Sequence, residues 1–293
     1  MIERLNETVG DLLCVGHAAY DITMAVSKHP QEDEKIVADA MQLSGGGPAA
    51  NAAVCAARLG GRAAFFGYLG RDLFGELHLQ ELQHEGVDCS QVIRGDFPSP
   101  VSQIIAKPDG CRALINFKGD TPWIAADALQ LEVFPKVILL DGHEPLISTP
   151  LCQWAKANGV PTVLDAGSLH RGTEELAPWV DYLVASEKFA RQWSGCDDML
   201  VALNALLLVN DTVVITLSER GLIWGRKGEK GEVAAFRVKA VDTTGAGDAF
   251  HGAFAYGLTQ AMAWDELLHY ASAIGALTCT RLGARAALPI MNV

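Results

Sequence analysis

The chain has 293 residues, of which 49% are hydrophobic and 20% charged, and its formal net charge is −12. This balance is that of a globular protein large enough to bury a core, and the acidic surplus argues against nucleic acid as the main partner. Any phosphate ligand must therefore be held by local amide dipoles and by metal ions rather than by a basic surface.

The cysteines and the N-terminal residues predict a cytoplasmic location. The seven cysteines are scattered and form no Cys-x-x-Cys pair, a pattern that favours reduced thiols. The N-terminal residues are rich in charge and no long apolar segment follows them, so we expect no signal peptide. No apolar run is long enough to predict a membrane span.

The first predicted strand is the short apolar run at residues 12–15, which is typical of a buried strand. Asp21 follows just past its C-terminal end, where ligands bind in open α/β sheets. From the residues alone, a solvated loop acid is an equally good interpretation of Asp21.

Four half-exposed strands are predicted next, because apolar and polar residues partly alternate in them. They do not fit a buried parallel sheet, so we expect a small separate sheet that forms a lid over the substrate, around residues 19–44 and 99–118. The predicted strands are 22–26, 35–43, 101–106 and 112–117.

A glycine-rich run at residues 44–51 opens an alanine-rich helix that ends near residue 60. Gly45-x-Gly47-x-x-Ala50 matches the dinucleotide fingerprint, which leaves an NAD-dependent oxidoreductase as an alternative. That fingerprint belongs directly after the first buried strand, whereas two predicted lid strands intervene here.

From residue 137 to residue 217, predicted strands and helices alternate regularly, which indicates a parallel sheet covered on both faces. We therefore expect a three-layer α/β/α core with a mostly parallel sheet. The absence of repeats or linkers in the sequence predicts a single domain over residues 1–293, with the lid inserted in it. The strands expected in this part of the core are 137–140, 161–164, 181–185 and 212–217.

The stretch from Asp242 to Gly252 carries the strongest chemical signal. It follows an apolar, β-branched run at residues 236–241 and leads into a small, apolar helix. The first N–H groups of a helix have no intrahelical partner and favour an anion, above all a phosphate. A carboxylate such as Asp248 beside an anion site indicates a base that deprotonates an attacking hydroxyl. The alternative is a helix N-terminal acid in a glycine turn.

Two segments resemble the signatures of the ribokinase-like (PfkB) carbohydrate kinases. Asp242-Thr243-Thr244-Gly245-Ala246-Gly247-Asp248-Ala249-Phe250 is similar to their C-terminal signature, and the run from Gly46 to Gly60 is similar to their N-terminal one. The resemblance covers nearly the whole chain. It implies a three-layer core with a β lid, the substrates ATP and a sugar, and Mg²⁺.

The resemblance also implies which residues contact the sugar. Its N-terminal glycines and Asn line the sugar site in these kinases, and an Asp after the first strand binds sugar hydroxyls. The implied substrate contacts are Asp21, Gly46, Gly47 and Asn51. Asn116 and His143 are further candidates, for which surface or packing roles are the simpler interpretation. An acidic group on the acceptor would call for a cation, for which His143 and Lys118 are candidates.

Other matches concern the nucleotide and the metals. By resemblance, ATP lies near Ser186, Thr216, Gly221, Thr243, Gly245, Gly247 and Cys279. Glu187 is a candidate Mg²⁺ contact, although Ser186-Glu187 departs from the usual Asn-x-x-Glu pattern and Ser186 is simply explained as a helix N-cap. The positions that bind K⁺ in the family fall on Asp242, Thr244 and Gly283.

The predicted function is transfer of the γ-phosphate of ATP to a primary hydroxyl of a small, ketose-like carbohydrate. Asp248 is the base, and the amides of Gly245, Ala246 and Gly247 stabilise the transferred phosphate. A nucleoside kinase of the same fold and a non-catalytic sugar-binding relative are the alternatives beside the oxidoreductase. A homodimer through the lid is a further expectation.

Overall fold

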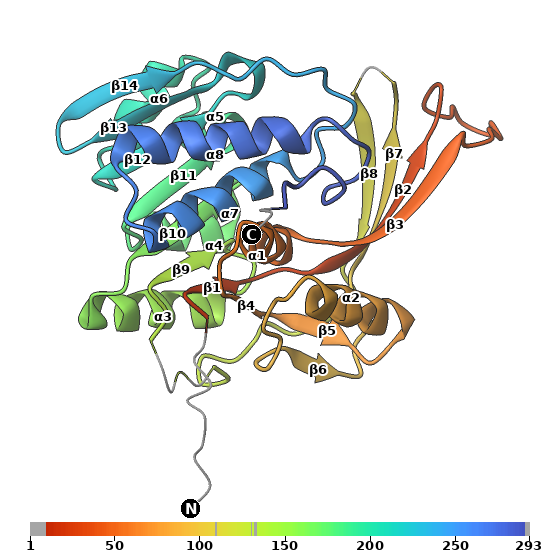
Figure 1. Cartoon of the computed structure of the whole chain (residues 1–293), viewed down its shortest axis with the longest axis horizontal. Helices are drawn as coiled ribbons and strands as arrows, with labels where there is room; N and C mark the ends of the chain where they lie inside the picture. The colour runs from red at the N-terminus through yellow and green to blue at the C-terminus, as the bar shows by residue number, and fades with distance from the viewer. Residues whose placement is uncertain (1–9, 109, 130, 132–133, 291–293) are drawn as a thin grey trace, which may run out of the picture.

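The computed structural model describes residues 10–108, 110–129, 131 and 134–290. Its centre is an eight-stranded sheet with the strand order β14-β13-β12-β11-β10-β9-β1-β4 (Figure 1). The strands from β4 to β12 in this order run parallel, and β13 and β14 add an antiparallel hairpin at one edge. They are β1 (Leu12–Val15), β4 (Ala63–Phe66), β9 (Val137–Leu140), β10 (Thr162–Ala166), β11 (Tyr182–Ser186), β12 (Thr212–Thr216), β13 (Leu222–Arg226) and β14 (Glu229–Val233).

Helices cover both faces of this sheet, which confirms the predicted three-layer core. Leu12 and Cys14 of β1 face the core formed with α1, α7 and α8, while Leu13 and Val15 face the core formed with α3, α4, α5 and α6. Successive side chains of a strand point to opposite faces, so complete burial of β1 requires a layer on each side. The helices are α1 (Pro48–Arg58), α7 (Ala246–Thr259), α8 (Trp264–Thr278), α3 (Pro145–Asn158), α4 (Arg171–Leu176), α5 (Glu187–Ser194) and α6 (Met199–Leu206).

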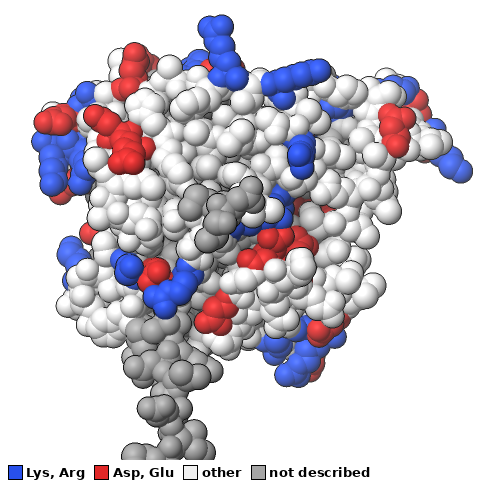
Figure 2. All heavy atoms as spheres, in the orientation of Figure 1, with Lys and Arg blue, Asp and Glu red and all other residues white. Residues whose placement is uncertain are grey.

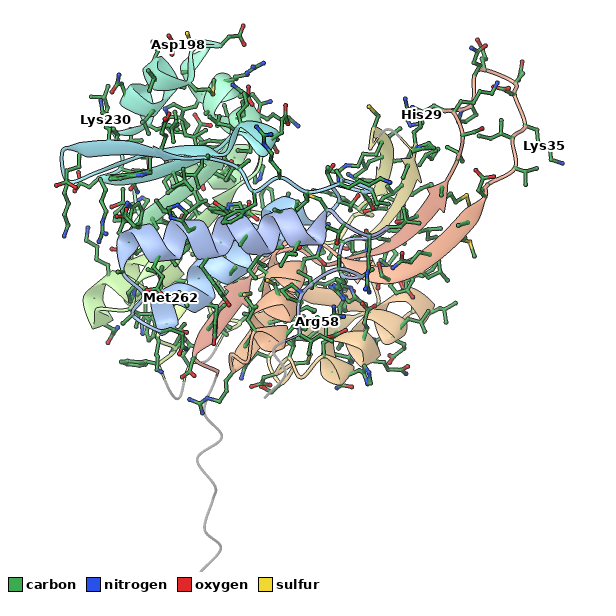
Figure 3. All side chains as sticks on the ribbon, turned by 45° about the horizontal axis from the view of Figure 1, so that its top comes forward. His29, Lys35, Arg58, Asp198, Lys230 and Met262 are labelled. Carbon is green, nitrogen blue, oxygen red and sulfur yellow. The ribbon has the colours of Figure 1, made fainter. Side chains whose placement is uncertain are left out.

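The lid is a separate four-stranded sheet with the order β3-β2-β7-β8. It extends from one side of the core, and its outer end carries His29 and Lys35 (Figures 1 and 3). The two predicted strand pairs form one sheet because β2 and β7 pair in parallel. The lid strands are β2 (Ala19–Ala25), β3 (Ala40–Gly46), β7 (Val101–Ala106) and β8 (Arg112–Phe117).

The remaining elements belong to neither of the two larger sheets: β5 and β6 pair with each other, and α2 contacts β5 and the lid strands β2 and β3. Asp72 caps α2 by accepting a hydrogen bond from the backbone N–H of Gly75 at 2.8 Å. A short 3-10 turn follows β12. These elements are β5 (Tyr68–Gly70), α2 (Leu73–His84), β6 (Ile93–Gly95) and η1 (Ser218–Arg220).

Two predicted strands begin elsewhere in the structure, and one hairpin was not predicted. The strand predicted at 35–43 begins only at residue 40, and the one predicted at 22–26 begins at residue 19. The β13–β14 hairpin was not predicted, because β14 is a short, polar edge strand. The apolar run 236–241 reaches the turn before α7 as a loop, and its larger side chains are more than a third exposed.

Figure 2 shows positive and negative side chains interspersed on this face of the molecule. No helix in the described residues has the length and apolar character needed to cross a bilayer. The homodimer through the lid and the cytoplasmic location stay predictions.

Candidate active site

The turn before α7 has the geometry of an anion site. Gly245 is its N-cap with φ of +75°, and a Cβ there would lie 2.6 Å from the Cβ of Ala284. Both facts require glycine at this position. At Gly247 a Cβ would meet nothing within 4 Å, so the first turn of α7 is open on this side. The unpaired amides of a helix N-terminus are therefore accessible to a ligand.

Asp248 lies in this first turn, and its carboxylate is held by α1. Its Oδ2 accepts a hydrogen bond from Nδ2 of Asn51 at 2.6 Å. Asn51 is almost fully buried, and its Oδ1 accepts from Nε of Arg285 at 2.8 Å. Asn51 and Asp248, which are 197 residues apart in the sequence, are thus in direct contact. The bond to Arg285 fixes the orientation of Asn51.

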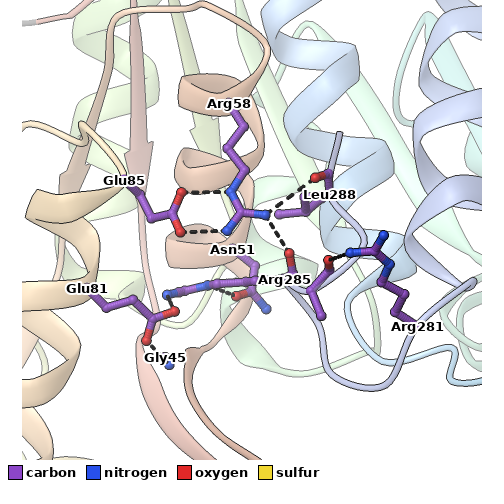
Figure 4. Close-up of polar contacts among 9 residues, drawn as sticks. Gly45, Asn51, Arg58, Glu81, Glu85, Arg281, Arg285 and Leu288 are labelled. Carbon is purple, nitrogen blue, oxygen red and sulfur yellow. Dashed lines mark hydrogen bonds and ion pairs between the residues drawn. The ribbon is translucent and has the colours of Figure 1, made fainter. Parts of the chain in front are cut away.

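Arg285, which no sequence pattern predicted, is the centre of the network in Figure 4. Arg285 is 2% exposed; its Nη1 donates to Oε1 of Glu81 at 2.8 Å, and its Nη2 lies 3.0 Å from Nε2 of His78. Glu81 also accepts from the backbone N–H of Gly45 at 2.5 Å. Arg285 follows the predicted residues Cys279 and Gly283 closely, but no local pattern links it to partners more than 200 residues away.

Arg58 fixes the backbone of the same segment. Its Nη1 donates to the carbonyl of Arg285 at 2.6 Å, and its Nε and Nη2 form a bidentate pair with Glu85 at 2.7 and 2.6 Å. Such planar, two-bond pairs are among the more specific charge-assisted interactions. The C-terminal segment is thereby fastened to α1 and α2.

The predicted sugar-binding residues lie together at the base of the lid. Asp21 is buried on β2, and this burial raises the pKa of its carboxyl group to about 6. A Cβ at Gly46 would come within 2.2 Å of Oδ2 of Asp21. Gly47 has φ of +92°, and a Cβ there would lie 2.5 Å from the carbonyl oxygen of His17. Gly46 therefore lets the backbone approach the carboxylate of Asp21 closely, and Gly47 lets it approach the carbonyl of His17.

Two further buried acids lie at the C-terminal ends of core strands: Asp141 directly follows β9, and Asp165 is near the end of β10. Neither was predicted as a site residue. Asp141 accepts backbone hydrogen bonds from His17 at 2.7 Å, His143 at 2.9 Å and Ala49 at 3.2 Å. Burial raises the pKa of Asp165 to about 7, opposed by nearby His251, whose Nδ1 is 3.3 Å away.

The nearby His251 has a structural role. Its ring nitrogens lie 2.6 Å from the carbonyl oxygen of Gly247 and 3.1 Å from that of Val184.

The residues predicted to bind K⁺ also come together. Asp242 is buried, and its Oδ1 accepts from the backbone N–H of Thr244 at 2.9 Å and from its hydroxyl at 2.7 Å. Its Oδ2 accepts from the backbone N–H of Gly283 at 2.8 Å. Arg112 of β8 reaches over from the lid and donates to Oγ1 of Thr244 at 2.9 Å.

A cavity of about 590 Å³ contains part of the predicted nucleotide site. Ser186 caps α5 as expected, accepting from the backbone N–H of Phe189 at 3.0 Å. The carboxylate of Glu187 forms ion pairs with Arg191 and Arg220. The residues that line this cavity are Ser186, Glu187, Lys188, Arg191, Gln192, Thr216 and Ser218.

Gly221 and Cys279 lie outside the lining of this cavity. Gly221 has φ of +89° and adjoins the backbone of Val233. The carbonyl of Cys279, just after α8, accepts from the backbone N–H of Val241 at 2.8 Å and holds the approach to the turn. Thr243 is exposed at that turn.

Of the last two sugar-binding candidates, His143 lines a cavity and Asn116 does not. His143 lines a second cavity of about 450 Å³. Asn116 is exposed on β8 and lines neither cavity. It shares a row of the lid sheet with Asp21, because both are in register with Ser102.

The dinucleotide fingerprint does not lie where a dinucleotide-binding fold would place it. Its first glycine, Gly45, belongs to lid strand β3 and not to the loop after core strand β1. The glycine run therefore packs against Asp21 and Glu81, which gives it a different role from that of a pyrophosphate loop.

Comparison with known proteins supports a single interpretation of these features. The family described as pfkB family carbohydrate kinase matches residues 9–291. Ribokinase of Haemophilus influenzae is 28% identical over 290 residues, which cover 95% of each chain. Fructokinase-1 of Zea mays is 31% identical over 282 residues, covering 83% of this chain and 85% of that one.

A solved structure extends the likeness to three dimensions. The structure of Arabidopsis thaliana ribokinase complexed with ribose and ATP has a TM-score of 0.81 and 25% identity, and the match covers 96% of each chain. The sandwich core and the separate small sheet of the present chain are thus a known architecture.

Proposed function

This chain belongs to the pfkB family of carbohydrate kinases, and we propose that it phosphorylates a primary hydroxyl of a small, ketose-like sugar, with Asp248 as the base. Transfer of a phosphate from ATP to a hydroxyl is the activity of its relatives, one of which has been solved with ribose and ATP. The likeness to a fructokinase supports the ketose-like acceptor.

One observation carries the proposal: a carboxylate with a fixed orientation beside the open first turn of a helix. Asn51 holds Asp248 at 2.6 Å. The amides of Gly247 and Asp248 in the first turn of α7 have no intrahelical partner, while the N–H of Ala246 donates to the carbonyl of Thr243 at 3.3 Å. Asp248 takes the proton from the acceptor hydroxyl, and that oxygen attacks the γ-phosphorus as the bond to ADP breaks. The amides donate to the equatorial oxygens, where charge develops.

We also propose that Mg²⁺ accompanies the nucleotide and is held mainly by its phosphates. In the described parts of the chain, no group of three or more His, Cys, Asp or Glu side chains is arranged to hold a metal. This fits Mg²⁺, which keeps several waters and commonly binds through phosphates and few carboxylates. If Glu187 contributes, Glu187→Gln should raise the Mg²⁺ concentration needed for half-maximal rate; an unchanged requirement would exclude that role.

A screen of ADP release tests the function. Neutral ketoses, aldoses and nucleosides are supplied with ATP, and the phosphorylated carbon is identified by NMR. Sugar-dependent ADP release with phosphate on a primary hydroxyl supports the proposal. Faster turnover of adenosine or another nucleoside than of any sugar would assign the chain to the nucleoside alternative, and NADH binding without ATP binding would restore the oxidoreductase.

A further inference from the structure

The cavity of about 450 Å³ lies where β1, β9 and β10 end, beside the segment that leaves the lid after β8. Several ionisable side chains line it among glycines, prolines and a tryptophan, and none of them belongs to the proposed phosphoryl-transfer machinery. The ionisable side chains lining it are those of His17, Tyr68, Lys118, His143, Glu144, His170 and Arg171.

Three imidazoles form a continuous row in this cavity. The ring centroids of His17 and His143 are 5.1 Å apart, and those of His143 and His170 are 4.8 Å apart with nearly parallel planes. Each ring follows a different strand of the central sheet, so the row is built by the fold and not by a local motif. Neutral imidazole always offers one N–H donor, and it gains a second on protonation.

Lys118 adds a cation to the row. Burial is the largest cause that lowers the pKa of His17, His143 and His170, and the ammonium of Lys118 lowers the pKa of all three rings as well. The lysine is therefore close enough to act on the whole row. Arg171 supplies a second cation, 5.1 Å above the ring of Trp123, although it also pairs with Glu175 at 2.8 Å.

The acidic groups around the row are already engaged. Asp141 accepts three backbone hydrogen bonds, as described above. Glu144 accepts from the backbone N–H of Ile124 at 2.7 Å, and burial raises the pKa of its carboxyl group to about 7. The cavity thus combines several donors and two cations with carboxyl groups that are either satisfied or partly protonated at neutral pH.

We propose that this cavity is a subsite for an anionic group of the acceptor, a carboxylate, phosphate or sulfonate carried away from the reacting hydroxyl. The acceptor class is therefore an acidic sugar derivative. This inference rests on the proposed function, because it presumes that the acceptor lies between the cavity and Asp248.

Direct contacts connect the cavity with the reacting end. The carbonyl oxygen of His17 adjoins Gly47, and Asp141 accepts from the backbone N–H of Ala49 at the start of α1. The carboxylate of Asp248 also acts electrostatically on His143. One acceptor that spans the sugar residues would thus place a distal group among the imidazoles.

The same lining is less suited to a neutral nucleobase. A base stacked on the row would leave the ammonium of Lys118 with only the partly protonated carboxyl of Glu144 to balance it. A bound anion receives charge-assisted hydrogen bonds from the ammonium and from the rings. A nucleoside that outperforms every acidic sugar would contradict the subsite.

The decisive measurement compares acceptors in matched pairs. Each pair shares the primary hydroxyl and the ring, and one member carries a carboxylate, phosphate or sulfonate at the far carbon. We expect kcat/KM to favour the anionic member by about tenfold or more, the scale of a charge-assisted hydrogen bond. The three kinds of anion show which group the subsite takes.

Charge reversal at Lys118 tests whether this lysine binds the anionic group. Lys118→Glu should remove the preference or reverse it, whereas Lys35→Glu, an equally large charge change on an exposed lysine at the outer end of the lid, should keep the wild-type ratio. A ratio near one in the wild type, or an unchanged ratio in Lys118→Glu, would overturn the inference.

Binding to Asp248→Asn separates this inference from the proposed function. Calorimetry with the anionic and neutral sugars reads the subsite without turnover. Preferential binding of the anionic member supports the subsite even if wild-type protein transfers no phosphate, which would defeat the proposed function alone. Equal affinities for both members, with wild-type turnover intact, would defeat the subsite alone.

The pH dependence gives an independent readout on the same variant. A bound anion favours the protonated forms of the facing titratable groups, which are the imidazoles of His17, His143 and His170 and the carboxyl of Glu144. The other charged groups that face the row are Lys118, Arg171, Asp141 and Asp248. Affinity for the anionic sugar should rise as pH falls from 8 to 6, through the pKa of Glu144 at about 7. An affinity that is constant or falls over this range would contradict the assignment.

Discussion

Arg285 donates from Nε to Oδ1 of Asn51 at 2.8 Å, across 234 residues of sequence, and this bond fixes which way the amide of Asn51 points. With its oxygen directed at the arginine, Asn51 presents Nδ2 to Asp248. A buried cation thus orients the proposed base through a neutral amide, without contacting the base itself. The arrangement keeps the carboxylate of Asp248 in place as an acceptor.

Asn51→Asp should disable this arrangement. A second carboxylate against Asp248 makes the pair share a proton, because like charges in contact raise the pKa of one of them. We expect turnover at pH 7 to fall about tenfold or more and to recover in part as the pH is raised to 9. The pH profile of kcat distinguishes this from a loss of sugar contact, which would give the same deficit at every pH. Asn158→Asp, at an exposed helix end, is the matched control.

The two glycines of the turn should respond in opposite ways. Gly245→Ala forces a Cβ into a left-handed backbone and against Ala284, so we expect the free energy of unfolding to fall by about 1–2 kcal/mol or more. Gly247→Ala meets open space and should leave stability unchanged or raise it by about 0.5–1 kcal/mol. Its methyl group would nevertheless occupy the face where we place the phosphate, so ATP affinity should fall.

Denaturant unfolding and ATP titration of both variants check this pair. If Gly247→Ala binds ATP as the wild type does, the phosphate lies elsewhere. If Gly245→Ala is as stable as the wild type, the turn relaxes in a way that the contact with Ala284 does not suggest.

The sequence predicted what local pattern controls. Alternating strands and helices indicated the layered core, and the glycines before Asp248 indicated an exposed helix N-terminus, because both depend on neighbouring residues. Arg285 escaped prediction because its partners, Asn51 and Glu81, are distant in sequence and nothing beside it is unusual. The row of imidazoles escaped for the same reason: its members follow three separate strands, and only the sheet order β10-β9-β1 brings them together.

Edge elements were the least predictable part of the fold. The β13–β14 hairpin turns at Lys227 and Gly228, both with positive φ, as a tight two-residue turn requires. Its β14 strand is short and polar, so hydrophobic pattern gave no signal. The lid strand β3 begins later than its pattern suggested, because the pairing with β2 ends at Ala40.

Asp21 should make stability depend on pH. Its folded-state pKa of about 6 lies above the ordinary value of 3.8, so the folded protein binds more protons between these limits. The contribution of this group is therefore full below pH 4 and is lost as the pH rises through 6. Asp21→Asn should raise Tm relative to the wild type at pH 8 and leave it nearly equal at pH 4, while raising KM for the sugar.

The difference between variant and wild type is the quantity to measure, because Asp165 and Glu144 have raised pKa values too and act in the same direction. Asp39→Asn, on the exposed part of the lid, serves as the control. A Tm difference that does not change with pH would show that the pKa of Asp21 is the same in the folded and the unfolded protein.

We expect K⁺ to increase turnover. The carboxylate of Asp242 joins the turn at Thr244 to the loop at Gly283, and oxygen ligands of this kind suit a hard cation. A cation there would stiffen the turn that presents the amides. Rates in K⁺ and in tetramethylammonium buffers of equal ionic strength give the answer; equal rates would leave Asp242 as a cap of the turn alone.

Asp248→Asn tests the central assignment. Asparagine keeps the size of the side chain but cannot accept the proton, so we expect turnover to fall by about 10²–10⁴-fold, the usual contribution of a general base. ATP binding should survive, because the amides of α7 are unchanged, and it should tighten slightly once no carboxylate faces the γ-phosphate. Sugar-dependent ADP release, ATP affinity and Tm should be measured on the same preparation.

Asp265→Asn supplies the matched control, because Asp265 is an exposed acid in the first turn of α8. As an acid near a helix N-terminus it should contribute about 0.3–1 kcal/mol to stability and nothing to turnover. If Asp248 has only that structural role, both variants will lose a little stability and keep their rates. A folded, ATP-binding Asp248→Asn variant with near-normal turnover would therefore remove Asp248 as the base, and the mechanism proposed for the turn at Gly245 would fail with it.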